Sequence, residues 1–193
     1  KLVRDGFRSS IYATTATADL LGVMLPDSAH IQESDAKRAA RRPNERISPP
    51  IYTMRDVTDC LSQVQPMDYE REVAPCRGVR CRFRDAGHIL GSAIIEVWVK
   101  ENNRTTKLVF SGDLGQPGRP IVRDPAPIED ADILVIESTY GDRTHSGLAG
   151  VEDEMVAIIK HTLHDRGGNV IIPAFAVGRT QQIIYQIHQL AHR

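Results

Sequence analysis

Three side chains that can bind a metal ion or transfer a proton lie next to short apolar segments of the chain. His88 precedes one apolar run, and Asp113 and Glu137 each follow another within a few residues. Such runs predict strands, and short loops at the ends of rigid strands position side chains accurately. One imidazole and two carboxylates presented at sheet edges therefore predict an active site.

His88 lies between Gly87 and Gly91. Glycines on both sides allow unusual backbone dihedral angles and let a ligand or metal ion approach closely. A hydrogen-bonded structural histidine remains the alternative interpretation, since a single histidine more often has that role. Asp113 has a similar alternative, because Gly-Asp-Leu-Gly at 112–115 is also a favourable turn sequence.

Glu137 directly follows four large aliphatic residues, which predicts a partly buried carboxylate at a sheet end. A carboxylate there needs a partner, and a divalent cation or a histidine would serve. One histidine and one aspartate are too few for zinc, which takes about three or four protein ligands. Other histidines do not supply the missing ligands: His145, His161, His164, His188 and His192. We therefore expect the remaining ligands to come from outside this chain.

A second kind of site is predicted near the C-terminal end of the sequence. Gly178, Arg179 and Thr180 precede a helical pattern, so free backbone N–H groups and a guanidinium would face an incoming anion. Tight packing of the helix on a strand explains the same glycine equally well. Both interpretations remain open from the residues alone.

The elements that position these residues follow from periodicity. Residues 93–99 and 107–110 predict an antiparallel meander, and the aliphatic run 133–136 predicts a buried strand. Asn169–Pro173 predicts a further strand, which a glycine-containing turn connects to a helix over 181–190. This order of strand, turn and helix indicates the start of a doubly wound unit.

The N-terminal part of the chain predicts helices. Threonines at 14–17 provide N-cap residues for a helix over 18–25, which Pro26 is expected to interrupt or kink. Thr53 and Asp56 form a capping-box pattern at the start of a second helix. Gly147 to Gly150 are interpreted as a linker.

Composition limits the function classes. The 193 residues are 41% hydrophobic, and 24 Lys and Arg balance 25 Asp and Glu, so no global basic field indicates a nucleic-acid partner. Any nucleic-acid site is then a local patch. Three cysteines without a C-x-x-C pair favour reduced thiols and an intracellular, cytoplasmic protein. No run is long enough for a membrane span, and the missing initiator Met indicates an internal piece of a longer polypeptide.

Four ordered motifs carry a resemblance to a known family. They are A-G-H-I-L-G-S-A at 86–93, F-S-G-D-L-G at 110–115, E-S-T-Y-G-D-R at 137–143 and P-A-F-A-V-G-R-T-Q-Q at 173–182. Together they resemble the β-CASP branch of the metallo-β-lactamase-fold nucleases, which includes the endonuclease subunit of the pre-mRNA 3′-end cleavage complex. The resemblance implies an α/β (α+β) fold, with part of a metallo-β-lactamase αββα sandwich over 1–145 and the start of a Rossmann-like β-CASP domain over 146–193.

The resemblance also implies roles for single residues. His88 matches a zinc ligand, Asp113 a carboxylate that bridges two zinc ions, and Glu137 an acidic residue that supports a histidine later in the family's sequences. Substrate-binding roles are expected for Arg179, Ser92 and Tyr140. The family's His-x-His-x-Asp-His motif is absent from this chain, and so are its two later histidine motifs. A complete dinuclear centre is therefore expected only in the intact protein.

The function implied by the resemblance is zinc-dependent hydrolysis of RNA phosphodiester bonds. Two zinc ions about 3.5–4 Å apart would lower the pKa of a shared water and polarise the phosphate. RNA is the expected partner. The protein is expected to act as a homodimer or within an RNA-processing complex, and no membrane partner is expected. Two alternatives remain: a noncatalytic paralogue that scaffolds an RNA-processing complex, and a hydrolase of small esters or thioesters on the same fold.

Overall fold

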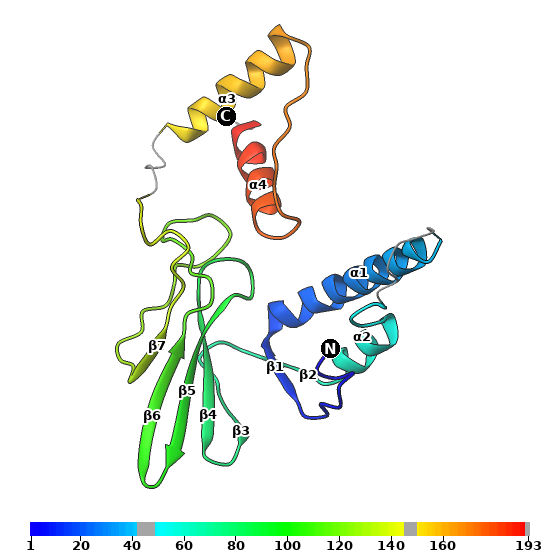
Figure 1. The fold of residues 1–193 in the computed structure, drawn as a ribbon. Coiled ribbons are helices and arrows are strands. Elements are labelled where there is room, and N and C mark those ends of the chain that lie inside the picture. The colour runs from blue at the N-terminus through cyan, green and yellow to red at the C-terminus, as the bar shows by residue number, and fades with distance from the viewer. Residues whose placement is uncertain (42–48, 145–149, 192–193) are drawn as a thin grey trace.

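The computed structural model describes residues 1–41, 49–144 and 150–191. In these parts, helices are combined with two sheets, which confirms the α+β class (Figure 1). The smaller sheet pairs β1 (Ile11–Thr14) with β2 (Val64–Met67) in parallel. The larger sheet has five strands in sequential order: β3 (Glu72–Cys76), β4 (Val79–Asp85), β5 (Ala93–Glu101), β6 (Arg104–Phe110) and β7 (Ile133–Val135).

The direction of β7 determines where the polar loops meet. Strands β3 to β6 are antiparallel, which confirms the predicted meander, but β7 runs parallel to β6. Phe110 is paired with Val135, and the N–H of Ser111 donates to the carbonyl of Val135 at 2.9 Å. Because both strands end at the same edge of the sheet, the loops that follow them lie side by side.

One face of the larger sheet combines a small apolar core with buried charge. Ala86, Ile94 and Val109 form the core, and Leu114 and Ile128 pack against it. Farther along β5, Glu96 is only 1% exposed and accepts hydrogen bonds from Arg82 and Lys107, both at 2.8 Å. Burial raises the pKa of Glu96, but the bonds from Lys107 and Arg82 outweigh it and hold the pKa below its ordinary value. The carboxylate is therefore ionised and joins β4, β5 and β6.

The first helix differs from the expectation. α1 (Thr15–Ala39) begins at Thr14, whose side chain accepts a hydrogen bond from the N–H of Thr17, and it continues through Pro26. A proline inside a helix removes one backbone hydrogen bond. Contacts with the segment at 51–54 hold the half of α1 beyond it: Ser28 accepts from Tyr52 at 2.7 Å, Gln32 from the N–H of Ile51 at 3.0 Å, and Glu33 from the N–H of Met54 at 2.9 Å. The predicted helix over 18–25 was too short, and Pro26 does not interrupt α1, because these tertiary contacts stabilise the turns beyond it.

The second helix agrees with its sequence signal. α2 (Met54–Leu61) starts at Thr53, which exchanges the reciprocal bonds of a capping box with Asp56. Val57 on this helix is 3% exposed, and α2 packs beside α1. None of the helices in the described ranges is sufficiently long and apolar to cross a membrane.

Two predicted strands have other environments. Residues 133–135 form β7, but its side chains are about half exposed because the strand is at the edge of the sheet. Asn169–Pro173 forms no strand: Ile171 is 88% exposed, and strand pairing in the described residues does not include this segment. A strand requires a neighbour for its backbone hydrogen bonds, and the aliphatic composition of both segments did not reveal whether one was present.

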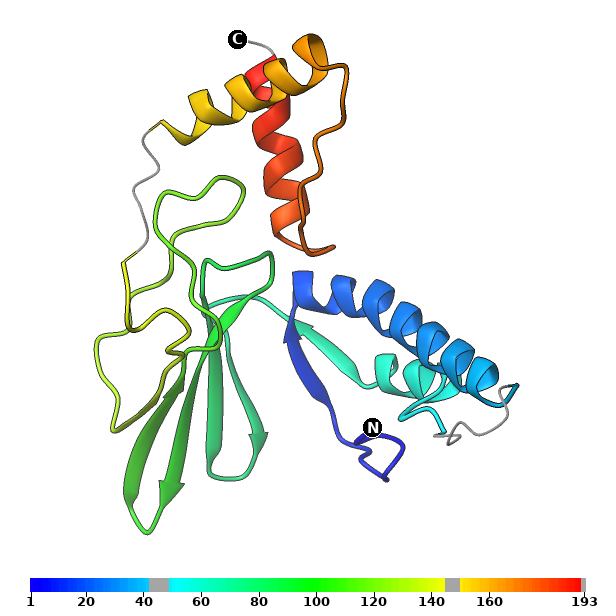
Figure 2. The same cartoon turned by 45° about the horizontal axis from the view of Figure 1, so that its top comes forward.

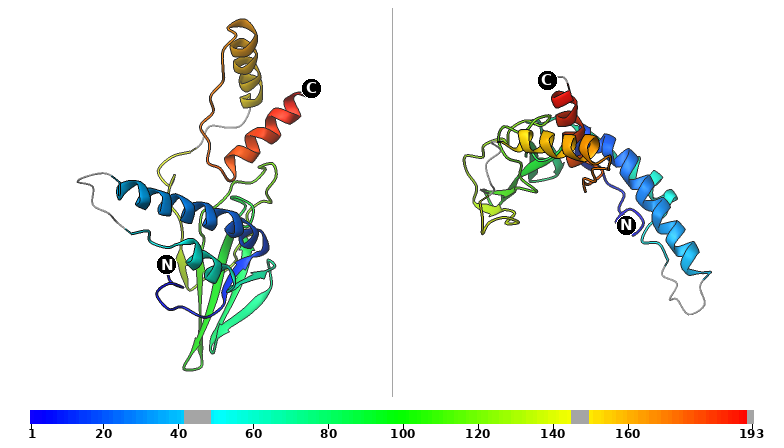
Figure 3. Two further views of the ribbon diagram at one scale, coloured as in Figure 1. Left: turned by 90° about the vertical axis from the view of Figure 1, so that its right-hand side faces the viewer. Right: turned by 90° about the horizontal axis from the view of Figure 1, so that it is seen from above.

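The turn that begins the last helix is in contact with the His88 loop. α3 (Val151–Lys160) continues into a π-helical turn, η1 (His161–Asp165), and α4 (Arg179–Ala191) follows. At the start of α4, a Cβ built on Gly178 would lie 2.6 Å from the Cγ2 atom of Ile89, so the turn is in contact with the His88 loop. Figure 2 shows this end of α4 pointing toward that loop and the first turn of α1. α1 itself extends away from the larger sheet (Figure 3).

Candidate active site

The His88 loop is held in place by its own polar groups. The N–H groups of His88 and Ile89 donate to the hydroxyl of Ser92, at 3.1 and 3.2 Å. Gly91 has a φ of 86°, and a Cβ there would lie 2.6 Å from the backbone nitrogen of Thr17. Its carbonyl accepts hydrogen bonds from the hydroxyls of Thr14 and Thr17, at 2.8 and 2.9 Å. Glycine is thus required at 91 because the start of α1 packs directly against the loop.

The structure brings His88, Asp113 and Glu137 together at the edge where β6 and β7 end. The Nε2 atom of His88 lies 4.0 Å from Oδ2 of Asp113, with side chains 45% and 75% exposed. Glu137 accepts a hydrogen bond from the N–H of Leu114 at 2.6 Å, which connects the loop after β7 to the loop after β6. The two loops are joined again by the N–H of Glu137, which donates to the Ser111 hydroxyl at 3.0 Å.

Glu137 is half-buried, in agreement with the prediction for that position. The hydrogen bond from the Leu114 N–H, then that from the Thr139 hydroxyl at 2.8 Å, lower the pKa of this carboxyl, and the nearby His88 lowers it further. A carboxylate with a lowered pKa stays ionised at neutral pH. Glu137 is therefore suited to accept hydrogen bonds and to orient a partner.

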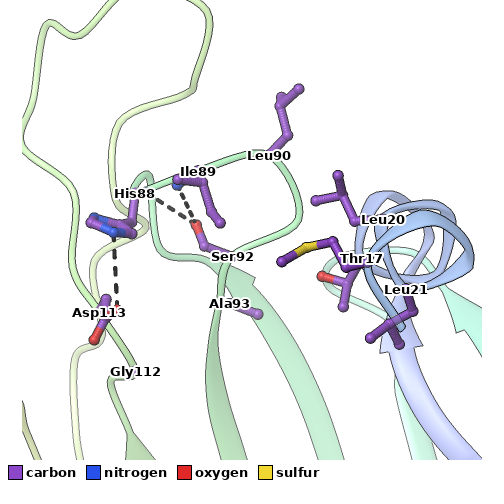
Figure 4. A pocket seen from close by; sticks show the side chains of 11 residues that line it. Thr17, Leu20, Leu21, His88, Ile89, Leu90, Ser92, Ala93, Gly112 and Asp113 are labelled. Carbon is purple, nitrogen blue, oxygen red and sulfur yellow. Dashed lines mark hydrogen bonds and ion pairs between the residues drawn. The ribbon is translucent and has the colours of Figure 1, made fainter. Parts of the chain in front are cut away.

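Two pockets flank this edge. The first, of about 300 Å³, is bounded on one side by His88, Asp113 and Ser92 and on the other by an apolar wall of α1 (Figure 4). The wall consists of Leu20, Leu21 and Met24. The second pocket, of about 350 Å³, is lined by Leu114 and has a more polar lining than the first, with these polar residues: Gln116, Glu137, Ser138, Thr139, Tyr140, Arg143 and Thr144. His88 and Asp113 thus line the pocket that α1 also lines, and Glu137 lines the second pocket.

The pair His88 and Asp113 suits part of a metal site. Two ligands of one tetrahedral zinc ion, each at about 2.0–2.2 Å, lie about 3.4 Å apart, so the observed 4.0 Å requires a movement of about 0.6 Å. In residues 1–41, 49–144 and 150–191, no three His, Cys, Asp or Glu side chains are grouped closely enough to hold a metal ion. These two residues fit a zinc site to which other groups must contribute.

Of the other histidines considered as ligands, three lie in the C-terminal helices. His161 and His164 are exposed in η1, and His161 contacts Asp165 at 2.9 Å. His188 lies in α4, with an exposed side chain. His145 and His192 lie outside the described residues.

The three predicted substrate contacts have different surroundings. Ser92 lines the first pocket, but its hydroxyl is already an acceptor for the loop amides. Tyr140 lines the second pocket and is 52% exposed. Arg179 is exposed at the start of α4, where the N–H of Gly178 donates to Oε1 of Gln181 at 2.8 Å. One N–H of this turn is therefore engaged within the chain, and the contact with Ile89 agrees with the packing interpretation of Gly178.

Sequence reasoning missed Ser111 and the α1 wall. Ser111 is 4% exposed and supports Glu137, as described above, although its position inside F-S-G-D-L-G was a usable signal. Leu20, Leu21 and Met24 carried no such signal, because aliphatic residues in a helix predict a core and not a pocket.

The Ser92→Ala substitution in the intact protein separates a loop-holding role from substrate contact. Two backbone amides lose their acceptor, so His88 becomes less ordered, and zinc affinity is expected to fall about 10–100-fold, as for other groups that orient metal ligands. The measurement is a competitive chelator titration. Ser62→Ala is the matched control. Ser62 follows α2, and its hydroxyl donates to the backbone carbonyl of Asp59, outside the His88 loop. Unchanged affinity for the metal with weaker substrate binding would instead assign Ser92 to substrate contact.

Comparisons with known proteins agree with the motifs. No protein-family model matches the chain. It is 34% identical to ribonuclease TTHA0252 of Thermus thermophilus over 193 residues, which are 100% of this chain and 40% of the relative. It is 32% identical to the transcription termination factor FttA of Pyrococcus abyssi over 190 residues, covering 96% of this chain and 27% of that protein. With the endoribonuclease YSH1 of Eremothecium gossypii the identity is 27% over 182 residues, covering 94% and 22%.

The chain thus spans about two fifths or less of the length of these relatives. The similarity covers nearly the whole chain in each case and includes all four motifs within it. These relatives share the metallo-β-lactamase fold with a β-CASP segment. Over nearly its whole length, the chain is therefore similar to members of the β-CASP branch of the metallo-β-lactamase-fold proteins.

Proposed function

We propose that the intact protein is a zinc-dependent ribonuclease that hydrolyses RNA phosphodiester bonds. The observation that carries this proposal is the convergence of His88, Asp113 and Glu137 at one sheet edge, in a chain 34% identical to a protein named as a ribonuclease. An imidazole and a carboxylate 4.0 Å apart are the ligand types that zinc takes in hydrolases.

In this proposal His88 and Asp113 would hold zinc together with ligands from elsewhere in the intact protein. When bound, the ions supply Lewis-acid chemistry at the phosphate and lower the pKa of a water. Asp113 is suited to this place because it follows β6 directly and its side chain is 75% exposed beside His88.

Glu137 is the positioning residue of the site. Its carboxylate accepts the N–H of Leu114 and the hydroxyl of Thr139, so it holds the loop that carries Asp113 and remains ionised. A histidine from elsewhere in the intact protein would be oriented by this carboxylate and would protonate the leaving 3′ oxygen. Such a proton transfer typically contributes about 10²–10⁴-fold to a rate.

Substrate is proposed to contact both sides of the sheet edge. Tyr140 lies beside Glu137, and Arg179 lies next to the turn that contacts the His88 loop. We propose the division into a metallo-β-lactamase part over 1–145 and a β-CASP part over 146–193 on the same grounds; its boundary lies outside the described residues. A site between two such parts would let a single strand of RNA pass across Asp113.

Removal of metal is the direct test. The intact protein is expected to cleave a single-stranded RNA oligonucleotide, to lose more than about 99% of this activity after chelation, and to recover it with Zn²⁺, because the water and phosphate chemistry depends on the ions. Gel analysis of labelled RNA measures the loss and the recovery. A small thioester tested in parallel separates the hydrolase alternative: thioester turnover without RNA cleavage, or RNA cleavage that survives chelation, would contradict the proposal.

A further inference from the structure

The polar pocket beside Glu137 contains an arginine that the family motifs did not single out for a role. Arg143 lines it together with Tyr140, Gln116 and Thr144. The pocket starts at Leu114, the residue after Asp113, and its other wall is the segment that follows Glu137. A strand of nucleic acid with one phosphate at Asp113 would therefore place a neighbouring nucleotide in or beside this pocket.

Two turns bring Arg143 onto the ring of Tyr140. The N–H of Gly141 donates to the carbonyl of Ser138 at 3.1 Å, and the N–H of Arg143 donates to the carbonyl of Tyr140 at 3.3 Å. The chain thus reverses direction, and the guanidinium carbon of Arg143 lies 5.1 Å from the centroid of the Tyr140 ring. A cation over an aromatic face at this distance is attracted by the ring and held in one orientation.

The charge on Arg143 is only weakly neutralised in the chain. Its Nε atom lies 3.6 Å from the carboxylate of Asp142, and the two side chains are 64% and 82% exposed, so solvent screens the pair strongly. A guanidinium has five N–H donors and matches the geometry of a phosphate. Glu137, a carboxylate of the pocket lining, is ionised, but it accepts hydrogen bonds from Leu114 and Thr139. Within the described residues Arg143 forms its ion pair with Asp142 and not with Glu137, so its guanidinium can meet a phosphate.

The opposite wall also favours an anion. Oε1 of Gln116 accepts a hydrogen bond from Arg119 at 3.1 Å, which orients the amide and leaves its NH₂ group as the donor. Arg119 adds a second positive charge next to Gln116. The hydroxyls of Thr139 and Thr144 complete a lining that can donate hydrogen bonds.

We propose that Arg143, positioned by the Tyr140 ring, binds the phosphate of the nucleotide next to the scissile one. Tyr140 then has a positioning role through Arg143, in addition to lining the pocket. This inference rests on the proposed function for the identity of the ligand, a single-stranded RNA. Among the described residues, the pocket beside α1 has no Lys or Arg in its lining, whereas the pocket beside Glu137 contains Arg143 and is the more polar of the two, so it takes the charged part of the strand.

Binding of RNA to the intact protein without metal tests the inference separately from cleavage. In the presence of a chelator, Arg143→Ala is expected to weaken the binding of a short fluorescein-labelled single-stranded RNA about tenfold, which corresponds to about 1.4 kcal/mol. The slope of log affinity against log salt concentration is expected to fall by about 0.7, the value for one lost phosphate contact to a single strand. Arg55→Ala is the matched control, because Arg55 is exposed on α2, away from both pockets.

Tyr140 variants test the positioning role. Tyr140→Phe keeps the aromatic face and is expected to bind RNA with the affinity of the unaltered protein. Tyr140→Leu removes the aromatic face, and its RNA affinity is expected to fall nearly as far as that of Arg143→Ala. Binding of Arg143→Ala with the affinity and salt slope of Arg55→Ala would overturn the inference, as would an intact protein that binds no RNA. Arg143-dependent binding without any cleavage in Zn²⁺ would uphold the inference and contradict the proposed nuclease activity.

Discussion

In the intact protein, Asp113→Ala is expected to abolish both zinc retention and RNA cleavage. The Asp113 carboxylate lies 4.0 Å from the imidazole of His88. The two side chains are therefore close enough to bind one metal ion together after a small movement. Loss of groups that only orient metal ligands costs about 10–100-fold, so if Asp113 is a metal ligand, as proposed, its removal should lower cleavage by more than about 100-fold. Metal content by mass spectrometry and cleavage of labelled RNA measure the two effects.

Asp59→Ala is the matched control for Asp113→Ala. Asp59 is also an exposed aspartate, but it lies on α2 and lines neither pocket. This variant should keep its zinc and its activity. A folded Asp113→Ala protein that still cleaves RNA would refute the role of Asp113. Loss of cleavage with full zinc retention would instead mean that Asp113 acts without holding the metal.

Glu96→Ala is expected to lower the free energy of unfolding by about 3–5 kcal/mol. The carboxylate is 1% exposed and lies within hydrogen-bonding distance of Arg82 and Lys107, with Arg84 at 3.7 Å. Its removal leaves Lys107, itself 8% exposed, with less compensation for its buried charge. The retained bond between Lys107 and Asp130 at the surface limits the loss. Urea denaturation followed by circular dichroism measures the change.

Glu72→Ala provides the comparison for Glu96→Ala. Glu72 and Arg80 also approach to 2.7 Å, but their side chains are 43% and 52% exposed, so the expected cost is only about 0–1 kcal/mol. Equal costs for the two variants would show that burial does not determine the strength of these pairs. Acid should also destabilise the protein through Glu96, because the pKa of this carboxyl is lower in the folded state than in the unfolded state. The stability that Glu96 contributes is fully present above the ordinary pKa of glutamate. It is lost as the pH falls through the lower pKa of the folded state.

Local signals in the sequence were sufficient for several elements. The alternation in 93–99 and 107–110 predicted the β5–β6 hairpin, and Thr53 with Asp56 predicted the start of α2. These predictions succeeded because each depends on residues a few positions apart. The extent of the first helix and the strand at Asn169–Pro173 were predicted wrongly. Both depend on distant parts of the chain: contacts that hold α1 beyond Pro26, and a neighbouring strand that Asn169–Pro173 does not have among the described residues.

For the candidate site, the sequence by itself determined which side chains are proposed to carry the chemistry, since His88, Asp113 and Glu137 each follow or precede an apolar run in a family motif. Their proximity was decided only by the tertiary structure. Parallel pairing of β6 with β7 joins residues more than twenty positions apart, and the hydrogen bond from Leu114 to Glu137 depends on that register. The same is true of Arg143, whose place over the Tyr140 ring and beside Glu137 comes from two turns and a pocket that no periodicity in the sequence predicts.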